Sequence, residues 1–213
     1  MTDAPPALLR RALLAAGLAA LAPQARAARG PVVTVLGDSI TAGLGLSAQA
    51  ALPAQLKLAL QRLGVDAIVR GAGVSGDTSA GGAARVDFSV QPGTSVCVVA
   101  LGGNDLLQGL DPKTTRANLD RILRRLKQRR IGVVLAGLKA PPEIGRGYAR
   151  DFNAVFPALA VAYGARLYPD LLAGVARSRA MNQPDGVHPN ARGVQVIARG
   201  LAPVVARALA AAE

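Results

Sequence analysis

Three side chains of this sequence are of the types that together activate a serine. Ser39 follows an apolar run, in Gly37-Asp38-Ser39, and His188 is the only histidine among the 213 residues. Asp185 precedes that histidine by three positions. A histidine oriented by a carboxylate can take the proton of a serine hydroxyl, which then attacks a carbonyl carbon. The set therefore indicates acyl transfer, with Ser39 as nucleophile, His188 as general base and Asp185 as the orienting acid.

Each of these side chains also has a plain structural explanation. Serine is favoured as the N-cap of a helix, so Ser39 could simply begin one. The Asp-x-x-His spacing fits a capping turn shaped by Gly186 and Pro189. Ser39 is not in a G-x-S-x-G motif, because Thr41 replaces the second glycine. The case for catalysis rests on the joint occurrence of the three residues at the ends of predicted elements.

A serine nucleophile also needs donors for the negative charge that forms on the substrate oxygen. The backbone N–H groups of Ser39 and Gly76 and the side-chain amide of Asn104 are the candidates, since the last two lie in glycine-rich segments after apolar runs. Alternatively, the glycines only form tight turns, with Asp77 and Asp105 as helix caps. Both interpretations can hold together, because such a turn creates the donor geometry.

The elements that must position these residues follow from the hydrophobic pattern. Short apolar runs alternate with runs of helical period, which indicates a parallel sheet covered on both faces. The polar, glycine-rich segments fall at strand ends, where such folds place their sites. Strands are expected at 32–36, 65–69, 96–101, 131–138 and 165–168. Helices are expected at 52–63 with Pro53 in the first turn, after the third strand in the Arg-rich stretch, at 148–163, and over 194–209 with a kink at Pro203.

The chain is strongly basic, with a formal net charge of +12. Much of this charge surrounds an apolar stripe of Leu119, Ile122, Leu123 and Leu126, which favours a solvated helix face over a nucleic-acid site. No nucleic-acid motif accompanies the charge, so no nucleic-acid partner is expected. The basic positions are Lys113, Arg116, Arg121, Arg124, Arg125, Lys127, Arg129 and Arg130.

Cysteine and histidine are too few for a disulfide or a zinc site. Cys97 is the single cysteine and lies in an apolar run, so it is expected to be a packed thiol. With one histidine and no ligand cluster, neither a metal nor another cofactor is expected.

Four blocks of the sequence resemble the SGNH, or GDSL, hydrolases, over residues 32 to about 207. The resemblance implies a flavodoxin-like α/β/α sandwich with a five-stranded parallel sheet, the triad Ser39, Asp185 and His188, and an oxyanion hole of Ser39, Gly76 and Asn104. It is strongest to the branch of periplasmic thioesterases, lysophospholipases and arylesterases, which implies ester, thioester or lysolipid substrates. Leu106 and Leu107 fall where relatives have a substrate-binding loop, although they could equally belong to the core. The blocks are Gly37-Asp38-Ser39, Gly73-x-x-Gly76-Asp77-Thr78, Gly102-Gly103-Asn104-Asp105 and Asp185-x-x-His188-Pro189.

Three other functions compete with this one. An esterase of carbohydrate or cell-wall O-acetyl groups would use the same residues on a smaller acyl group. A binding module without catalysis is disfavoured because every catalytic block is present. A nucleic-acid binder would rest on charge alone. The sequence indicates no oligomeric state.

The first 27 residues are expected to be a signal peptide, followed by a single hydrolase domain at 28–213. Arg10 and Arg11 precede the apolar run 12–22, and Ala25-Arg26-Ala27 has small residues where a signal peptidase cuts. The run is too short to span a membrane, so we expect no stable membrane insertion. A signal peptide would direct the mature product to the periplasm or outside the cell. The intact mass of exported protein should correspond to cleavage after or close to Ala27. A full-length cytoplasmic product would contradict this prediction.

Overall fold

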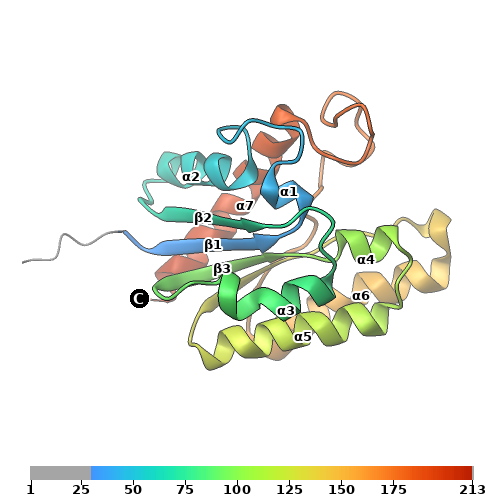
Figure 1. Cartoon of the computed structure of the whole chain (residues 1–213), viewed down its shortest axis with the longest axis horizontal. Helices are drawn as coiled ribbons and strands as arrows, with labels where there is room; N and C mark the ends of the chain where they lie inside the picture. The colour runs from blue at the N-terminus through green and yellow to red at the C-terminus, as the bar shows by residue number, and fades with distance from the viewer. Residues whose placement is uncertain (1–29, 213) are drawn as a thin grey trace, which may run out of the picture.

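The computed structural model describes residues 30–212, so the expected signal peptide lies outside the described residues. Five parallel strands form one sheet in the order β2-β1-β3-β4-β5 (Figure 1). The predicted fold class, an α/β sandwich with a five-stranded parallel sheet, is therefore confirmed. The strands are β1 (Val32–Gly37), β2 (Ile68–Gly73), β3 (Thr94–Ala100), β4 (Gly132–Ala136) and β5 (Arg166–Tyr168).

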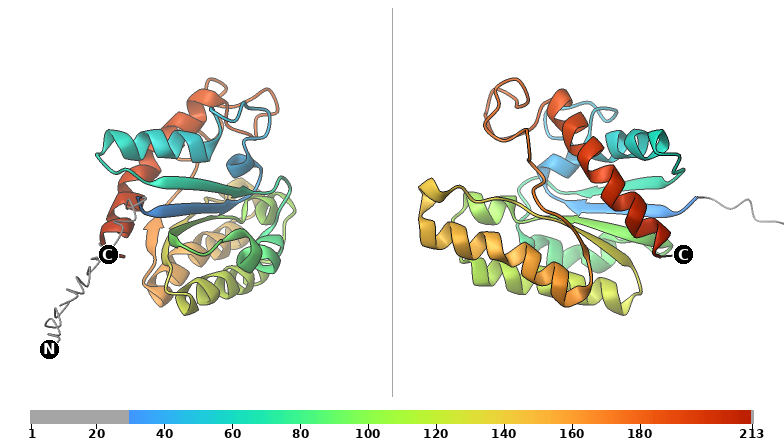
Figure 2. Two further views of the ribbon diagram at one scale, coloured as in Figure 1. Left: turned by 60° about the vertical axis from the view of Figure 1, so that its left-hand side comes forward. Right: turned by 180° about the vertical axis from the view of Figure 1, so that it is seen from behind.

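Helices cover both faces of the sheet, and short helices follow the strand ends (Figures 1 and 2). One face carries α2 (Leu52–Arg62) and α7 (Ala191–Ala210), which pack on each other. The other face carries α3 (Ser79–Ser89), α5 (Pro112–Gln128) and α6 (Arg146–Tyr163). The short elements are α1 (Ser39–Ala42) after β1, α4 (Gly103–Leu107) after β3, and the 3-10 turn η1 (Pro142–Ile144).

Amphipathic packing explains where the long helices lie. On α5 the four predicted apolar residues are fully buried, whereas the basic side chains that precede its last turn are exposed, so the predicted solvated face is confirmed. Helix α7 has the length and composition of a membrane span, but 56% of that window is buried in this fold. It passes through Pro203 without interruption. Cys97 is fully buried in β3, and burial raises the pKa of its thiol to about 12, as expected for a packed side chain.

The second strand was predicted at 65–69 but begins at Ile68 and ends at Gly73. The N–H of Val65 donates to the carbonyl of Leu60 at 3.0 Å, and Gly64 before it has φ +76. These contacts close the end of α2. Val65 is therefore part of the turn that ends α2. The strand β2 begins three residues later and includes two glycines, which are uncommon in strands.

The sequence did not predict helix α3, and the alternative in which Asp77 and Asp105 cap helices is wrong for Asp77 but holds for Asp105, at a different helix from the one that contains it. The N-cap of α3 is Thr78, whereas Asp77 pairs with Arg85 instead. Asp105 lies within α4, but its carboxylate accepts the backbone N–H of Ser79 at 2.7 Å. Asp105 thus caps the first turn of α3, which lies 26 positions away in the sequence. Helix α3 itself lacks the apolar periodicity from which a helix could be predicted.

Asp105 should make a large contribution to stability. Its side chain is fully buried and also accepts the hydroxyls of Thr115, at 3.1 Å, and Ser79. Asp105→Ala leaves those donors without a partner, which should lower the free energy of unfolding by about 3 kcal/mol. Asp151→Ala is the control, because that carboxylate is 58% exposed in a surface ion pair and should change stability by less than about 1 kcal/mol. Equal losses in urea unfolding would contradict the role of Asp105.

Candidate active site

The end of β1 presents Ser39 at the first turn of α1. Asp38, not Ser39, is the N-cap: its Oδ1 accepts the N–H of Ile40 at 3.0 Å. The alternative explanation of Ser39 as a helix cap is therefore wrong, and its hydroxyl is available for another partner. The backbone around α1 is tightly packed, since a Cβ at Gly37 would lie 2.1 Å from Oγ1 of Thr41.

The structure brings Ser39, His188 and Asp185 together, although 149 positions separate the serine from the histidine. The Nε2 of His188 lies 3.0 Å from the Oγ of Ser39, and its Nδ1 lies 2.6 Å from Oδ2 of Asp185. The other carboxylate oxygen accepts the backbone N–H groups of Val187 (2.9 Å) and His188 (3.0 Å). Gly186 makes this turn possible with φ +71. The arrangement can pass a proton from the serine to the histidine.

A second set of contacts, which the sequence analysis missed, anchors the loop that carries His188. The side-chain amide of Gln183 donates to the carbonyl of Leu44 at 2.8 Å and to that of Pro189 at 3.0 Å. Its backbone N–H donates to the carbonyl of His188 at 2.8 Å. Gln183 therefore connects the histidine loop to the segment after α1. Nothing in the local sequence distinguishes this glutamine from a surface residue.

Two aspartates near Ser39 have opposite environments. The backbone N–H of His188, the His188 side chain and the N–H of Val187 lower the pKa of Asp185 to about 2. Burial raises the pKa of Asp38 to about 6, because the ionised form loses its hydration. Asp185 is consequently ionised at neutral pH, whereas Asp38 gains or loses its proton at about pH 6.

The proposed oxyanion donors come from three neighbouring strand ends. The N–H of Ser39 begins α1, and Gly76 lies in the loop between β2 and α3 with φ +84. A Cβ at Gly76 would meet no atom within 4 Å, so its backbone angle rather than space requires glycine. Asn104 on α4 donates one amide hydrogen to the carbonyl of Asp77 at 2.8 Å, which leaves a second amide hydrogen.

A pocket of about 160 Å³ opens beside Ser39, His188 and Asn104. Both predicted substrate-binding leucines line it: Leu106 packs partly on the core, and Leu107 is 66% exposed. Gly76 is not among the lining residues. A larger cavity, of about 740 Å³, lies near the amino-terminal ends of β4 and β5, away from the strand ends that carry Ser39 and Asn104. None of the predicted catalytic residues lines it. Within residues 30–212, no cluster of three metal-ligating side chains occurs.

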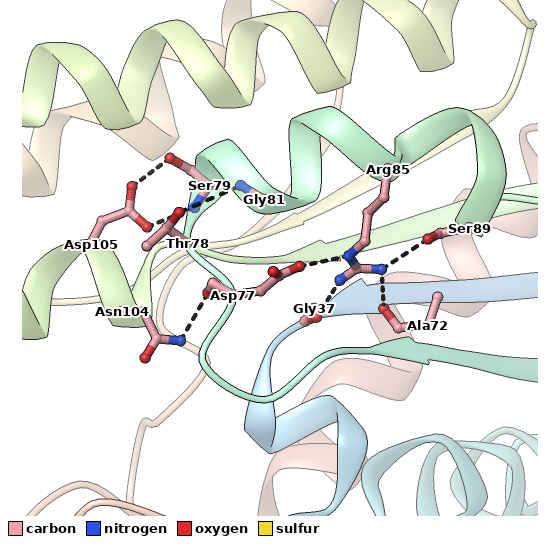
Figure 3. A network of polar contacts seen from close by, with 10 residues as sticks. All are labelled: Gly37, Ala72, Asp77, Thr78, Ser79, Gly81, Arg85, Ser89, Asn104 and Asp105. Carbon is pink, nitrogen blue, oxygen red and sulfur yellow. Dashed lines mark hydrogen bonds and ion pairs between the residues drawn. The ribbon is translucent and has the colours of Figure 1, made fainter.

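Arg85 on α3 is the other residue that the sequence analysis missed (Figure 3). Its Nε donates to Oδ2 of Asp77 at 2.6 Å, and its terminal nitrogens donate to the carbonyls of Ala72 (2.9 Å) and Gly37 (2.8 Å). A further bond joins it to the hydroxyl of Ser89 at 2.9 Å. The sequence around Arg85 does not distinguish it from the many other basic residues, so these contacts could not be predicted from it.

The raised pKa of Asp38 predicts a pH-dependent stability. The native state holds this proton more tightly than the unfolded chain does, so stability should fall as pH rises from about 4 to about 6. The loss should approach about 3 kcal/mol. Asp38→Asn keeps a capping oxygen but cannot ionise. The variant should match the parent at pH 4 and exceed its unfolding free energy at pH 7.5. A difference that is the same at both pH values would exclude this cause.

Comparison with known proteins identifies the family of this chain. Residues 35–196 match the model of the GDSL-like lipase/acylhydrolase family. The chain is 37% identical to "Esterase TesA" of Pseudomonas aeruginosa over 180 residues, which cover 84% of this chain and 90% of that protein. It is also 37% identical to "Thioesterase 1/protease 1/lysophospholipase L1" of Escherichia coli K12 over 166 residues, 78% of each protein.

Solved structures show the same relationship. The esterase AlinE4, described as an SGNH-hydrolase family esterase, has 43% identity and a TM-score of 0.71, with 84% of this chain and 97% of that chain covered. The crystal structure of TesA has 34% identity and a TM-score of 0.78, with 84% and 99% covered. Sequence blocks, sheet order and these relatives agree: the chain belongs to the GDSL-like lipase/acylhydrolase family and is a carboxylic ester hydrolase of the SGNH type.

Proposed function

We propose that this hydrolase cleaves carboxylic esters and thioesters of the arylesterase, acyl-thioesterase or lysophospholipase type through an acyl-enzyme on Ser39. The observation that carries the proposal is the continuous contact from Ser39 through His188 to Asp185. The names of the similar proteins include esterase, thioesterase and lysophospholipase, which agree with these substrates.

In the proposed reaction His188 takes the proton of Ser39 as the serine oxygen bonds to the carbonyl carbon. The same imidazole then protonates the departing alkoxide or thiolate, and the acyl group remains on the serine. Water, deprotonated by His188, releases the acid and restores the hydroxyl. Because the pKa of Asp185 is lowered to about 2, its carboxylate stays ionised above about pH 3 and stabilises the imidazolium that forms.

The tetrahedral intermediate places a negative charge on the former carbonyl oxygen. We assign its donors as the N–H of Ser39, the N–H of Gly76 and the second amide hydrogen of Asn104. The first of these begins a helix, and the third already has its amide held by the carbonyl of Asp77. Donors fixed before the reaction stabilise the charge without reorganising.

The pocket walls support an acyl chain as the bound group. Apolar side chains form much of the lining of the pocket, and two of them, Leu107 and Val187, are exposed, at 66% and 44%. An extended chain would cover that surface, and an acetyl group would not. The alternative, an O-acetyl esterase, would leave these side chains without a role.

The cellular location of the hydrolase is proposed from the expected signal peptide alone. Residues 1–27 are expected to direct export, so the mature hydrolase would act in the periplasm or outside the cell. Its partners would be small ester, thioester or lysolipid molecules, with no nucleic acid.

Triad function predicts non-additive mutations. Ser39→Ala and His188→Ala should each lower kcat by about 10⁴-fold or more, and the double variant should be little worse than either single variant, since both residues serve one step. Asp185→Ala should cost less. Initial rates on a nitrophenyl ester, with active protein carefully excluded from the variant preparations, give the measurement. Losses that multiply in the double variant would show that the two residues do not share a step.

Acyl-chain length distinguishes the two substrate classes. Each methylene buried on Leu107 or its neighbours should raise kcat/KM about fourfold, equivalent to about 0.8 kcal/mol, from the acetate ester until the apolar surface is covered. Leu107→Ser should flatten that rise. Val161→Ser, which changes a side chain that is 85% exposed on α6, is the matched control and should leave the profile unchanged. A profile that collapses beyond acetate would favour the O-acetyl esterase.

A further inference from the structure

The guanidinium of Arg85 joins two segments of the chain: the end of β1, and the stretch that runs from the end of β2 into the following loop. It donates to the carbonyl of Gly37 at the end of β1 and to that of Ala72 near the end of β2. Its ion pair with Asp77 reaches the loop that follows β2 (Figure 3). The side chain is 17% exposed, so little water competes for these bonds.

Both segments lead directly to a proposed oxyanion donor, and one of them also contacts the third. Gly37 stands two positions before Ser39, and Asp77 directly follows Gly76. The backbone carbonyl of the same Asp77 accepts the amide of Asn104 at 2.8 Å. Movement of Asp77 would therefore displace both Gly76 and Asn104, whereas movement of Gly37 would displace Ser39.

Arginine is the side chain that suits this position. Its planar fork has five N–H donors, so one group can serve two carbonyls, one hydroxyl and one carboxylate at once. A lysine could keep the charge beside Asp77, but its ammonium is a compact point charge that cannot reproduce the fork.

We propose that Arg85 is a positioning residue for the oxyanion hole, holding the segments of Ser39, Gly76 and Asn104 in the arrangement that binds the intermediate. The inference rests on the proposed function, because it assigns to Arg85 a role in placing donors that the proposed reaction requires. Arg85 itself does not contact the reacting atoms.

Arg129 provides a matched control. Its side chain is 19% exposed, it pairs with Asp87 at 3.6 Å, and it donates to the carbonyl of Val90 at the far end of α3. Arg85→Ala should lower kcat by about 10- to 100-fold with KM changed by less than about threefold, as expected when a donor for the transition state is misplaced. Arg85→Lys should lose less. Arg129→Ala should lower the melting temperature but leave kcat within about twofold.

A double-mutant cycle with Asn104→Ala separates positioning from general loosening. Asn104→Ala should lower kcat by about 10²- to 10³-fold. If Arg85 positions this donor together with the others, adding Arg85→Ala to Asn104→Ala should cost less than Arg85→Ala costs in the parent, because one of the donors that it positions is already gone. Multiplying losses, or an Arg85→Ala variant that behaves like Arg129→Ala, would overturn the role of Arg85. If Arg85→Ala does not fold, Asp77→Asn removes the same ion pair and takes its place in the cycle.

The cycle also distinguishes the two proposals. An Asn104→Ala variant with unchanged kcat would overturn the proposed oxyanion hole, and the role of Arg85 with it. A large loss for Asn104→Ala together with full kcat in Arg85→Lys, Arg85→Ala and Asp77→Asn would overturn the inference about Arg85 alone.

Discussion

The parallel pairing of β1 with both of its neighbours is the constraint on which the site depends. Gly37 at the end of β1 is in register with Gly73 of β2 on one side and Ala100 of β3 on the other. Three chain segments therefore leave the sheet at one level, and Ser39, Gly76 and Asn104 follow within four positions of those ends. Hydrogen bonds between strands, rather than contacts within the site, decide that these residues meet.

Glycine at these strand ends lets the chain turn closely over the sheet. A Cβ at Gly73 would lie 2.3 Å from the backbone nitrogen of Ala42, so any larger residue would push α1 away from the strand end. The helix that starts with Ser39 would move with it. The guanidinium of Arg85 donates to the carbonyls of Ala72 and Gly37 at these strand ends, and the carbonyl of Gly37 also accepts the backbone N–H of Val74 at 3.1 Å.

Two carboxylates within the site differ because of their surroundings. Asp185 lies in a turn whose backbone N–H groups face its oxygens, which lowers its pKa to about 2 and suits a permanently charged partner for His188. The side chain of Asp38 accepts the N–H of Ile40 but lies buried against Gly103, and burial raises its pKa to about 6. Environment, and not residue type, thus suits one aspartate to its proposed role as orienting acid and makes the other a cap that is costly to ionise.

Local patterns in the chain were sufficient for the sheet, most of its helices and the residue types of the site, because alternating apolar periods and motif spacing are properties of short segments. The start of β2 and the helix α3 were not predictable in this way, since a helix-ending turn takes Val65 and α3 has little apolar period. The contacts of Asp105 with Ser79, of Arg85 with Gly37 and of Gln183 with Leu44 join residues 26, 48 and 139 positions apart. Those partners became neighbours only when the sheet and its helices packed, so tertiary structure alone decided that Asp38 caps the helix, that Ser39 faces His188, and that a guanidinium joins the strand ends.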